Sequence, residues 1–198
     1  LAGAAVVFAL AASARLDAAS TRWNHPDLVT SVDTPYGRIT LTRTEGRTAL
    51  FENDALSFES EGTAAEELAH LAALQTERTE RVLLVGGIAE GFVPELLLHR
   101  PVALTALEVN GALLDVVRAA LPGRLGETAP GVVRTIVGDP RGGLPPEERY
   151  DLIVIGAPEP LSGQANRFHT KEFFLECRKR MEPGGVLALR LRGNENLR

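Results

Sequence analysis

RVLLVGGIAEGFVPELL, residues 81–97, decides the fold, because it joins a run of branched apolar residues to two glycines and then to a helix-like segment. A continuous apolar run is typical of a strand buried on both faces, and Pro94 suits the first turn of the helix that follows. A glycine loop at such a junction can hold a nucleotide. Here the loop lacks the third glycine of the common fingerprint and carries Ile88, Ala89 and Glu90 in its middle.

The rest of the chain continues this alternation of strand and helix. Apolar runs predict five strands, most of them separated by helical segments, near residues 82–86, 103–108, 132–137, 151–156 and 185–191. Strands that alternate with helices form a parallel sheet with crossover helices. The predicted fold class is therefore α/β, with a doubly wound, Rossmann-like parallel-sheet domain.

A small antiparallel β-hairpin domain is predicted ahead of this sheet. Residues 36–60 alternate apolar and polar positions in short runs between turn residues, whereas residues 21–35 have the turn signals of a connector. A helix is then expected from the N-cap Thr63, with one face formed by Leu68, Leu71 and Leu74. The predicted domains are an apolar segment, the hairpin region and the Rossmann-like domain, at 1–20, 21–62 and 63–198.

The first 14 residues, LAGAAVVFALAASA, are apolar or small throughout and predict a helix whose surface needs a partner. They are fewer than the about 20 residues that span a bilayer. Three interpretations fit: the end of a membrane helix, the core of a signal peptide, and an alanine-rich soluble helix. Arg15 and Arg22 follow the segment and favour the first, with the rest of the chain at the cytoplasmic face.

Composition excludes several classes of function. The 198 residues carry a net charge of −5, so the basic surface of a nucleic-acid-binding protein is missing. The one cysteine, Cys177, excludes an internal disulfide framework and fits a buried helix position. The four histidines are scattered without metal-ligand spacing, and no metal cofactor is expected.

Polar residues follow several of the predicted strands, at the edge where an open α/β sheet binds its ligands. Gly86 and Gly87 follow the first strand, and Glu108 ends the second about 20 residues later, the spacing at which a carboxylate holds ribose hydroxyls. Asp139 follows the third strand, and Glu159 follows the fourth. Each has a structural alternative as a turn glycine, a helix cap or a solvated acid, but their joint order favours a cofactor site.

The order of these segments resembles the polyamine aminopropyltransferase family, which comprises spermidine synthase and its relatives. The resemblance covers roughly residues 31–192 and rests on RVLLVGG, LEVN, IVGDP, YDLIVIGAPEP, NRFHTKEFF and MEPGGVLAL. It is closest to the bacterial subgroup fused to membrane helices. S-adenosylmethionine methyltransferases share the core fold, so a single segment would not distinguish the two families.

The resemblance implies roles for individual residues. Gly86, Gly87 and Gly91 would cradle the tail of decarboxylated S-adenosylmethionine, Glu108 would hold the ribose, and Asp139 would bind the adenine amino group. The family reaction is attack by a putrescine amine on the propyl carbon beside the sulfonium, with release of methylthioadenosine. The full predicted cofactor-binding set is Gly86, Gly87, Glu90, Gly91, Glu108, Val109 and Asp139.

The chain departs from the family on the amine side of the site. The family's Asp-Ser-Ser-Asp-Pro, whose first Asp is its base, is matched by residues 156–160, GAPEP. Gly156 therefore stands at the position of the base, and Glu159 is the acid that is left. The glycine loop has lost its aspartate, for which Glu90 is the expected substitute. Gly37 stands for the family's glutamine, and residues 65–67, AEE, stand for its Tyr-His-Glu.

The function predicted from this resemblance is a spermidine-synthase-like protein. It would bind decarboxylated S-adenosylmethionine, S-adenosylmethionine or methylthioadenosine and transfer an aminopropyl group to an amine if catalysis survives the lost base, with Glu159 as the catalytic candidate. A non-catalytic nucleoside-binding domain of a membrane protein and an S-adenosylmethionine-dependent methyltransferase are the alternatives. The expected partners are a small nucleoside, a polyamine, a membrane reached through the N-terminus and a second copy in a homodimer.

Overall fold

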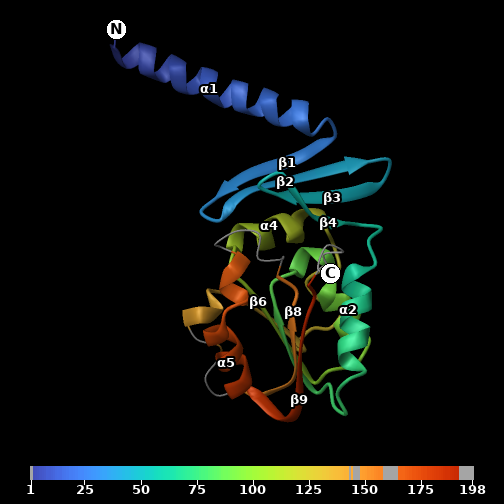
Figure 1. Cartoon of the computed structure of the whole chain (residues 1–198). Coiled ribbons are helices and arrows are strands. Elements are labelled where there is room, and N and C mark those ends of the chain that lie inside the picture. Colours follow the sequence, from blue (N-terminus) through green and yellow to red (C-terminus); the bar gives the residue numbers. More distant parts are fainter. Residues whose placement is uncertain (1, 143, 145–147, 158–164, 192–198) are drawn as a thin grey trace, which may run out of the picture. The chain divides into compact units, whose positions relative to one another are not determined.

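The computed structural model of the chain describes residues 2–142, 144, 148–157 and 165–191. It divides into two compact units, Leu1–Glu61 and Gly62–Arg198. The first unit holds a long helix and an antiparallel sheet, and the second holds a parallel sheet with helices on its faces (Figure 1).

The first unit confirms the predicted antiparallel hairpins and adds one strand to them. Helix α1 (Ala2–Asn24) leads into β1 (Leu28–Thr34), β2 (Gly37–Thr44), β3 (Arg47–Glu52) and β4 (Ala55–Glu59), which pair in that order. The prediction of a connector over 21–35 was wrong, because the residues between its two turn signals form strand β1. The sequence of β1, LVTSVDT, is rich in β-branched residues and alternates between half-buried and exposed positions, as a strand with one packed face does.

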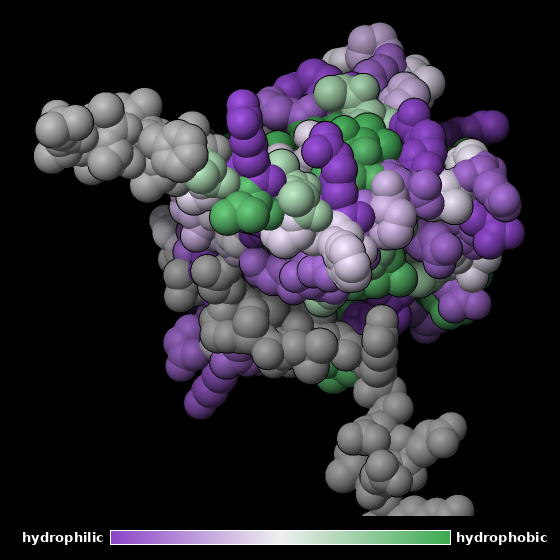
Figure 2. Space-filling view, turned by 90° about the horizontal axis from the view of Figure 1, so that it is seen from above, coloured by the Kyte–Doolittle hydropathy of each residue, from purple (hydrophilic) through white to green (hydrophobic). Residues whose placement is uncertain are grey.

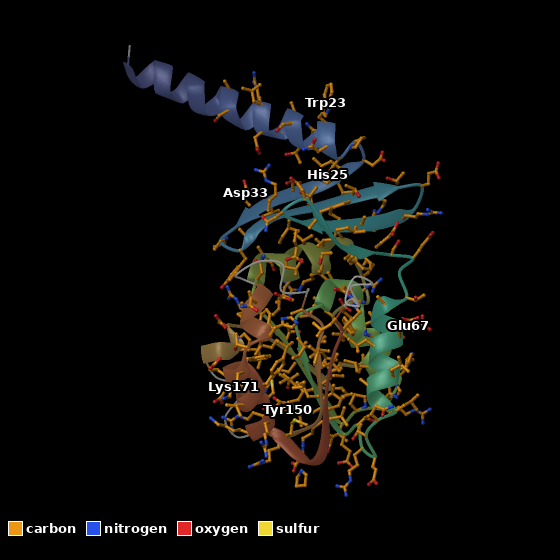
Figure 3. All side chains as sticks on the ribbon, viewed as in Figure 1. Trp23, His25, Asp33, Glu67, Tyr150 and Lys171 are labelled. Carbon is orange, nitrogen blue, oxygen red and sulfur yellow. The ribbon has the colours of Figure 1, made fainter. Side chains whose placement is uncertain are left out.

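The C-terminal end of α1 is held to the sheet by charges. The Arg38 guanidinium lies 2.9 Å from the Asp17 carboxylate of α1 and 2.7 Å from Asp33 of β1. The hydrogen bonds to Asp33 and then Asp17 raise the pKa of Arg38 above its ordinary value. Trp23, by contrast, lies on the side of α1 away from the strands and is 87% exposed (Figure 3).

On the face seen in Figure 2, most side chains drawn in colour are hydrophilic, with apolar ones between them. Among the described large apolar side chains of this unit, those exposed are Leu16, Trp23, Val29 and Leu56. Within the part of the chain that the structure describes, no helix combines the length and the apolar character needed to cross a membrane.

The second unit contains the predicted parallel sheet. Its strands are β5 (Arg81–Val85), β6 (Ala103–Glu108), β7 (Val133–Val137), β8 (Tyr150–Ile155) and β9 (Met181–Leu189), in the order β7-β6-β5-β8-β9. All four neighbouring pairs are parallel, which confirms the predicted Rossmann-like class. The connecting helices are α2 (Ala64–Ala73), α3 (Phe92–Leu97), α4 (Gly111–Ala120) and α5 (Lys171–Lys179), with 3-10 turns η1 (Ile88–Glu90), η2 (Pro140–Gly142) and η3 (Ala165–Phe168).

The core of this unit lies on both faces of the two central strands, β5 and β8. Residues 82–85 and 152–155 are no more than 2% exposed, as expected of parallel strands covered on both sides. Helices α5 and α2 cover opposite faces (Figure 1). On the α5 face, Phe173 and Cys177 pack on β5 and β8, and burial raises the pKa of the Cys177 thiol to about 12. Cys177 is therefore a core residue, as its position in the sequence indicated.

Helix α2 forms where predicted but buries a different face. Its buried residues are Ala65, Ala69, Ala72 and Ala73. Leu71 and Leu74 of the expected leucine face are 61% and 75% exposed. Thr63 precedes the helix without a side-chain capping bond. Small side chains let a helix approach its neighbour closely, so the packed face of α2 follows the alanines rather than the larger apolar residues.

Two histidines join α2 to the end of α3. His70 Nδ1 lies 2.8 Å from His99 Nε2, and His70 Nε2 lies 3.3 Å from Glu95 Oε2. Burial, and then the neighbouring His70, lower the pKa of His99. The two rings and the Glu95 carboxylate thus form one chain of polar contacts between α2 and the end of α3.

The depressed pKa of His99 predicts that acid destabilises the chain. The unfolded chain binds a proton at His99 more readily than the folded chain, so this contribution to stability is present above pH about 6.5 and is lost as the pH falls below it. We expect the thermal midpoint of His99→Gln to fall less between pH 7.5 and 5.5 than that of the unchanged chain. Equal falls, measured by circular dichroism, would contradict the role of His99.

Candidate nucleoside site at the carboxyl edge of the sheet

The ends of the parallel strands bring the predicted site residues to one edge. Val85 pairs with Leu107 on one side and with Ile155 on the other, so β5, β6 and β8 end level with one another. The Gly86 N–H donates to the Leu107 carbonyl at 2.8 Å, and the Gly156 N–H donates to the Val85 carbonyl at 3.0 Å. The glycine loop therefore lies between the ends of β6 and β8, where an α/β sheet holds its ligands.

The glycine loop adopts a backbone that side chains rarely allow. Gly86, Gly87 and Gly91 have φ of +69°, +72° and +98°. A Cβ at Gly87 would lie 2.6 Å from the Gly156 carbonyl oxygen, and a Cβ at Gly91 would overlap the Arg124 guanidinium. The loop thus needs glycine both for its conformation and for its close contacts. The sequence indicated the need for glycine at this turn but not the contacts with Gly156 and Arg124.

Gly156, at the end of β8, is closely packed as well. A Cβ there would lie 2.9 Å from two carbons of the Phe92 ring and 3.0 Å from the Gly86 carbonyl oxygen. Phe92 itself is 1% exposed. A larger side chain at position 156 therefore requires the Phe92 ring or the glycine loop to move.

This packing predicts stability losses for single alanine substitutions. Gly87→Ala combines a left-handed backbone, which costs about 1–2 kcal/mol, with a contact to backbone that cannot easily move, so we expect a loss of about 2 kcal/mol or more. Gly156→Ala is expected to cost about 1–3 kcal/mol through overpacking. Gly138→Ala is the matched control, because no described atom lies within 4 Å of a Cβ there. Urea unfolding measures all three, and equal stabilities would refute the packing argument.

Glu108 ends β6 beside this loop, with its side chain turned into the structure. The residue is 6% exposed, and the Asn110 N–H donates to Glu108 Oε1 at 3.0 Å. This bond fixes the carboxylate at the turn into α4. Val109, between the two, is half-buried against the core of the α5 face. The Glu108 carboxylate is therefore a held hydrogen-bond acceptor at the end of β6.

Asp139, two residues past the end of β7, has a partner that the sequence did not suggest. Arg167, from η3, lies 3.2 Å from Asp139 Oδ2, and the Arg167 side chain is 12% exposed. The pair joins the end of β7 to the segment before α5. Asp139 is thus placed at the predicted edge, and its carboxylate is held by a cation.

Glu90, in the middle of the glycine loop, is also paired. Its Oε2 lies 3.4 Å from Arg190 Nη2, with the Glu90 side chain 10% exposed and that of Arg190 40% exposed. Arg124 Nη1 donates to the Glu90 carbonyl oxygen at 2.7 Å, and burial lowers the pKa of Arg124. Two guanidinium groups therefore contact the loop through one residue.

Sequence reasoning missed the three arginines of this edge, Arg124, Arg167 and Arg190. Each stands in an ordinary polar segment, and the contacts join residues 28 to 100 positions apart. A sequence motif carries no sign of such distant pairs. The predicted catalytic residue Glu159 lies outside the described residues. Among those that the structure describes, no group of three or more histidines, cysteines and acids could hold a metal ion.

Comparison with known proteins places this fold and edge in a family. The family model described as "Spermine/spermidine synthase domain" matches residues 61–194. A polyamine aminopropyltransferase from Korarchaeum cryptofilum is 32% identical over 130 residues, which cover 65% of this chain and 40% of that protein. One from Prochlorococcus marinus is 30% identical over 172 residues, which cover 83% of this chain and 59% of that protein. The chain thus spans about half the length of these relatives.

Solved structures share the fold. A crystal structure of spermidine synthase in complex with the transition-state analogue AdoDATO has a TM-score of 0.74 at 20% identity, covering 82% of this chain and 57% of that one. Spermidine synthase from Thermotoga maritima has a TM-score of 0.71 at 19% identity, covering 82% and 56%. Because the family model covers well over half of the residues, the chain belongs to the spermine/spermidine synthase domain family.

Proposed function

We propose that the carboxyl edge of the parallel sheet binds an adenosine ligand of the methylthioadenosine and decarboxylated S-adenosylmethionine type. The observation that carries the proposal is the placement of the Glu108 carboxylate at the end of β6, directly beside the positive-φ loop of Gly86 and Gly87. A strand-end acid beside a glycine loop is how sheets of this class hold ribose. The spermidine synthase structure that shares this fold is a complex with the transition-state analogue AdoDATO.

The chemistry proposed for the site is that of an aminopropyltransferase relative whose amine side is altered. The family reaction needs a base for the incoming ammonium group. At the position that resembles the family's base, this chain has Gly156, and Phe92 and Gly86 take up the space of a side chain there. Glu159 is the acid that remains in that stretch. The proposal is therefore that nucleoside binding is retained more fully than transfer to putrescine.

Isothermal titration with methylthioadenosine tests the binding proposal directly. This nucleoside carries the adenine, the ribose and the thioether but no charged tail, so its affinity reports the nucleoside half of the site alone. Saturable binding at a 1:1 ratio is expected. If methylthioadenosine releases no heat and does not raise the thermal midpoint, the site does not hold a nucleoside of this type.

Four further predictions from the sequence concern the surroundings of the site. Membrane attachment through residues 1–20, a place at the cytoplasmic face and membership of the membrane-fused subgroup stay predictions. Vesicle co-sedimentation tests the membrane attachment. A homodimer is expected on resemblance alone, and analytical ultracentrifugation measures it.

A further inference from the structure

The Glu90–Arg190 pair spans the middle of the candidate site. Arg190 follows β9, and Glu90 belongs to the loop after β5, while β8 lies between these two strands. Neighbouring strands are about 4.8 Å apart, so the pair crosses about 10 Å of the sheet edge. The pair therefore links the glycine loop that follows β5 to the residue that follows β9, two strands away at the same edge of the sheet.

The charges of this pair are complementary to a tail of mixed charge. Glu90 offers a carboxylate to an ammonium group. Arg190 has five N–H donors and is 40% exposed, so it retains donors for a second carboxylate beyond its contact with Glu90. The Arg124 guanidinium on the Glu90 carbonyl adds positive charge to the same loop. A tail that carried only an ammonium group would be repelled by the Arg190 and Arg124 guanidinium groups, and it has no carboxylate to offset this repulsion.

From this arrangement we infer that the site selects a nucleoside with an amino acid tail, carrying both ammonium and carboxylate, over one with an aminopropyl tail. Glu90 holds the ammonium group and Arg190 holds the carboxylate. This inference rests on the nucleoside part of the proposed function, that the same edge holds the adenine and ribose of the ligand. It differs from that proposal in the tail, for which it favours S-adenosylmethionine over its decarboxylated form.

The test compares three ligands by isothermal titration against the unchanged chain. S-adenosylmethionine and decarboxylated S-adenosylmethionine differ only in the carboxylate, and methylthioadenosine lacks the charged tail. We expect S-adenosylmethionine to bind about tenfold or more tightly than its decarboxylated form, since a charge-assisted hydrogen bond has this effect. Equal affinities, or tighter binding of the decarboxylated form, would overturn the inference. Binding of methylthioadenosine in the same experiment would show that the proposed nucleoside site itself stands.

Substitution of Arg190 assigns the preference to one side chain. Arg190→Gln is expected to remove the preference for S-adenosylmethionine while leaving the affinity for methylthioadenosine within about twofold, whereas Arg190→Lys retains part of the preference through its charge. Arg118→Gln is the matched control, because Arg118 is exposed and paired with Asp115 on α4. A preference that survives Arg190→Gln, in a chain whose circular dichroism is unchanged, would also overturn the inference.

Discussion

Glu108→Ala is expected to weaken the binding of methylthioadenosine by about tenfold or more. The variant would lose the bidentate contact of the buried carboxylate with the ribose hydroxyls, a charge-assisted interaction of about 1.5–3 kcal/mol. Isothermal titration of the variant and the unchanged chain measures the difference. An unaltered affinity would mean that the nucleoside lies elsewhere.

Comparison of Glu108→Gln with Glu108→Ala separates binding from folding at this position. Glu108→Gln keeps an acceptor for the Asn110 N–H, so it should preserve stability and still lose affinity with the charge. Glu108→Ala leaves that donor without this partner and is expected to cost about 1–3 kcal/mol of stability as well. Glu172→Ala, an exposed acid in the first turn of α5, is the control for the removal of a negative charge.

Transfer of an aminopropyl group to putrescine is expected to be slower by about 10²–10⁴-fold than for the Thermotoga maritima spermidine synthase assayed in parallel. General-base catalysis typically contributes this factor, and position 156 has no side chain to supply it. The measurement is release of methylthioadenosine from decarboxylated S-adenosylmethionine. Fast turnover that Glu159→Gln abolishes would contradict the expectation and assign the base to Glu159.

Restoring an acid by Gly156→Asp alone is not expected to restore transfer. The new Cβ would lie 2.9 Å from the Phe92 ring, so the variant must distort its own site before the carboxylate can reach an amine. Thermal unfolding of this variant, run beside the activity assay, distinguishes a displaced acid from an unfolded chain. A stable and active Gly156→Asp protein would show that the ring moves aside without cost.

The parallel sheet could be predicted from the sequence because its strands are buried on both faces. Strands buried on both faces need apolar residues at consecutive positions, and such runs are visible in the sequence. The run RVLLV of β5 ends within one residue of the predicted strand end. Strand β1 was missed because its alternating polar residues, between two turn signals, look like a connector. The face of α2 was also missed, since its contacts depend on small alanines whose size does not stand out in a hydropathy pattern.

Some residues of the candidate site could likewise be predicted from the sequence, and others could not. Glu108 and Asp139 could be placed because a strand end is visible in the sequence, and parallel strands bring their ends to one edge. Arg167 and Arg190 could not be placed, because they reach that edge from later segments through pairs that only the folded chain defines. Net charge at a binding edge is therefore poorly predicted from the residues that lie closest to it in sequence.

The contact between Phe92 and Gly156 makes these two positions epistatic. Phe92→Ala alone is expected to cost about 3–5 kcal/mol by opening a cavity, and an acid at position 156 alone meets the intact ring. An acid introduced at position 156 alone is therefore expected to lower stability, whereas the Phe92→Ala change opens space beside it. In a double-mutant cycle the two losses should fail to add. The tolerance of position 156 for a side chain thus depends on the residue at position 92.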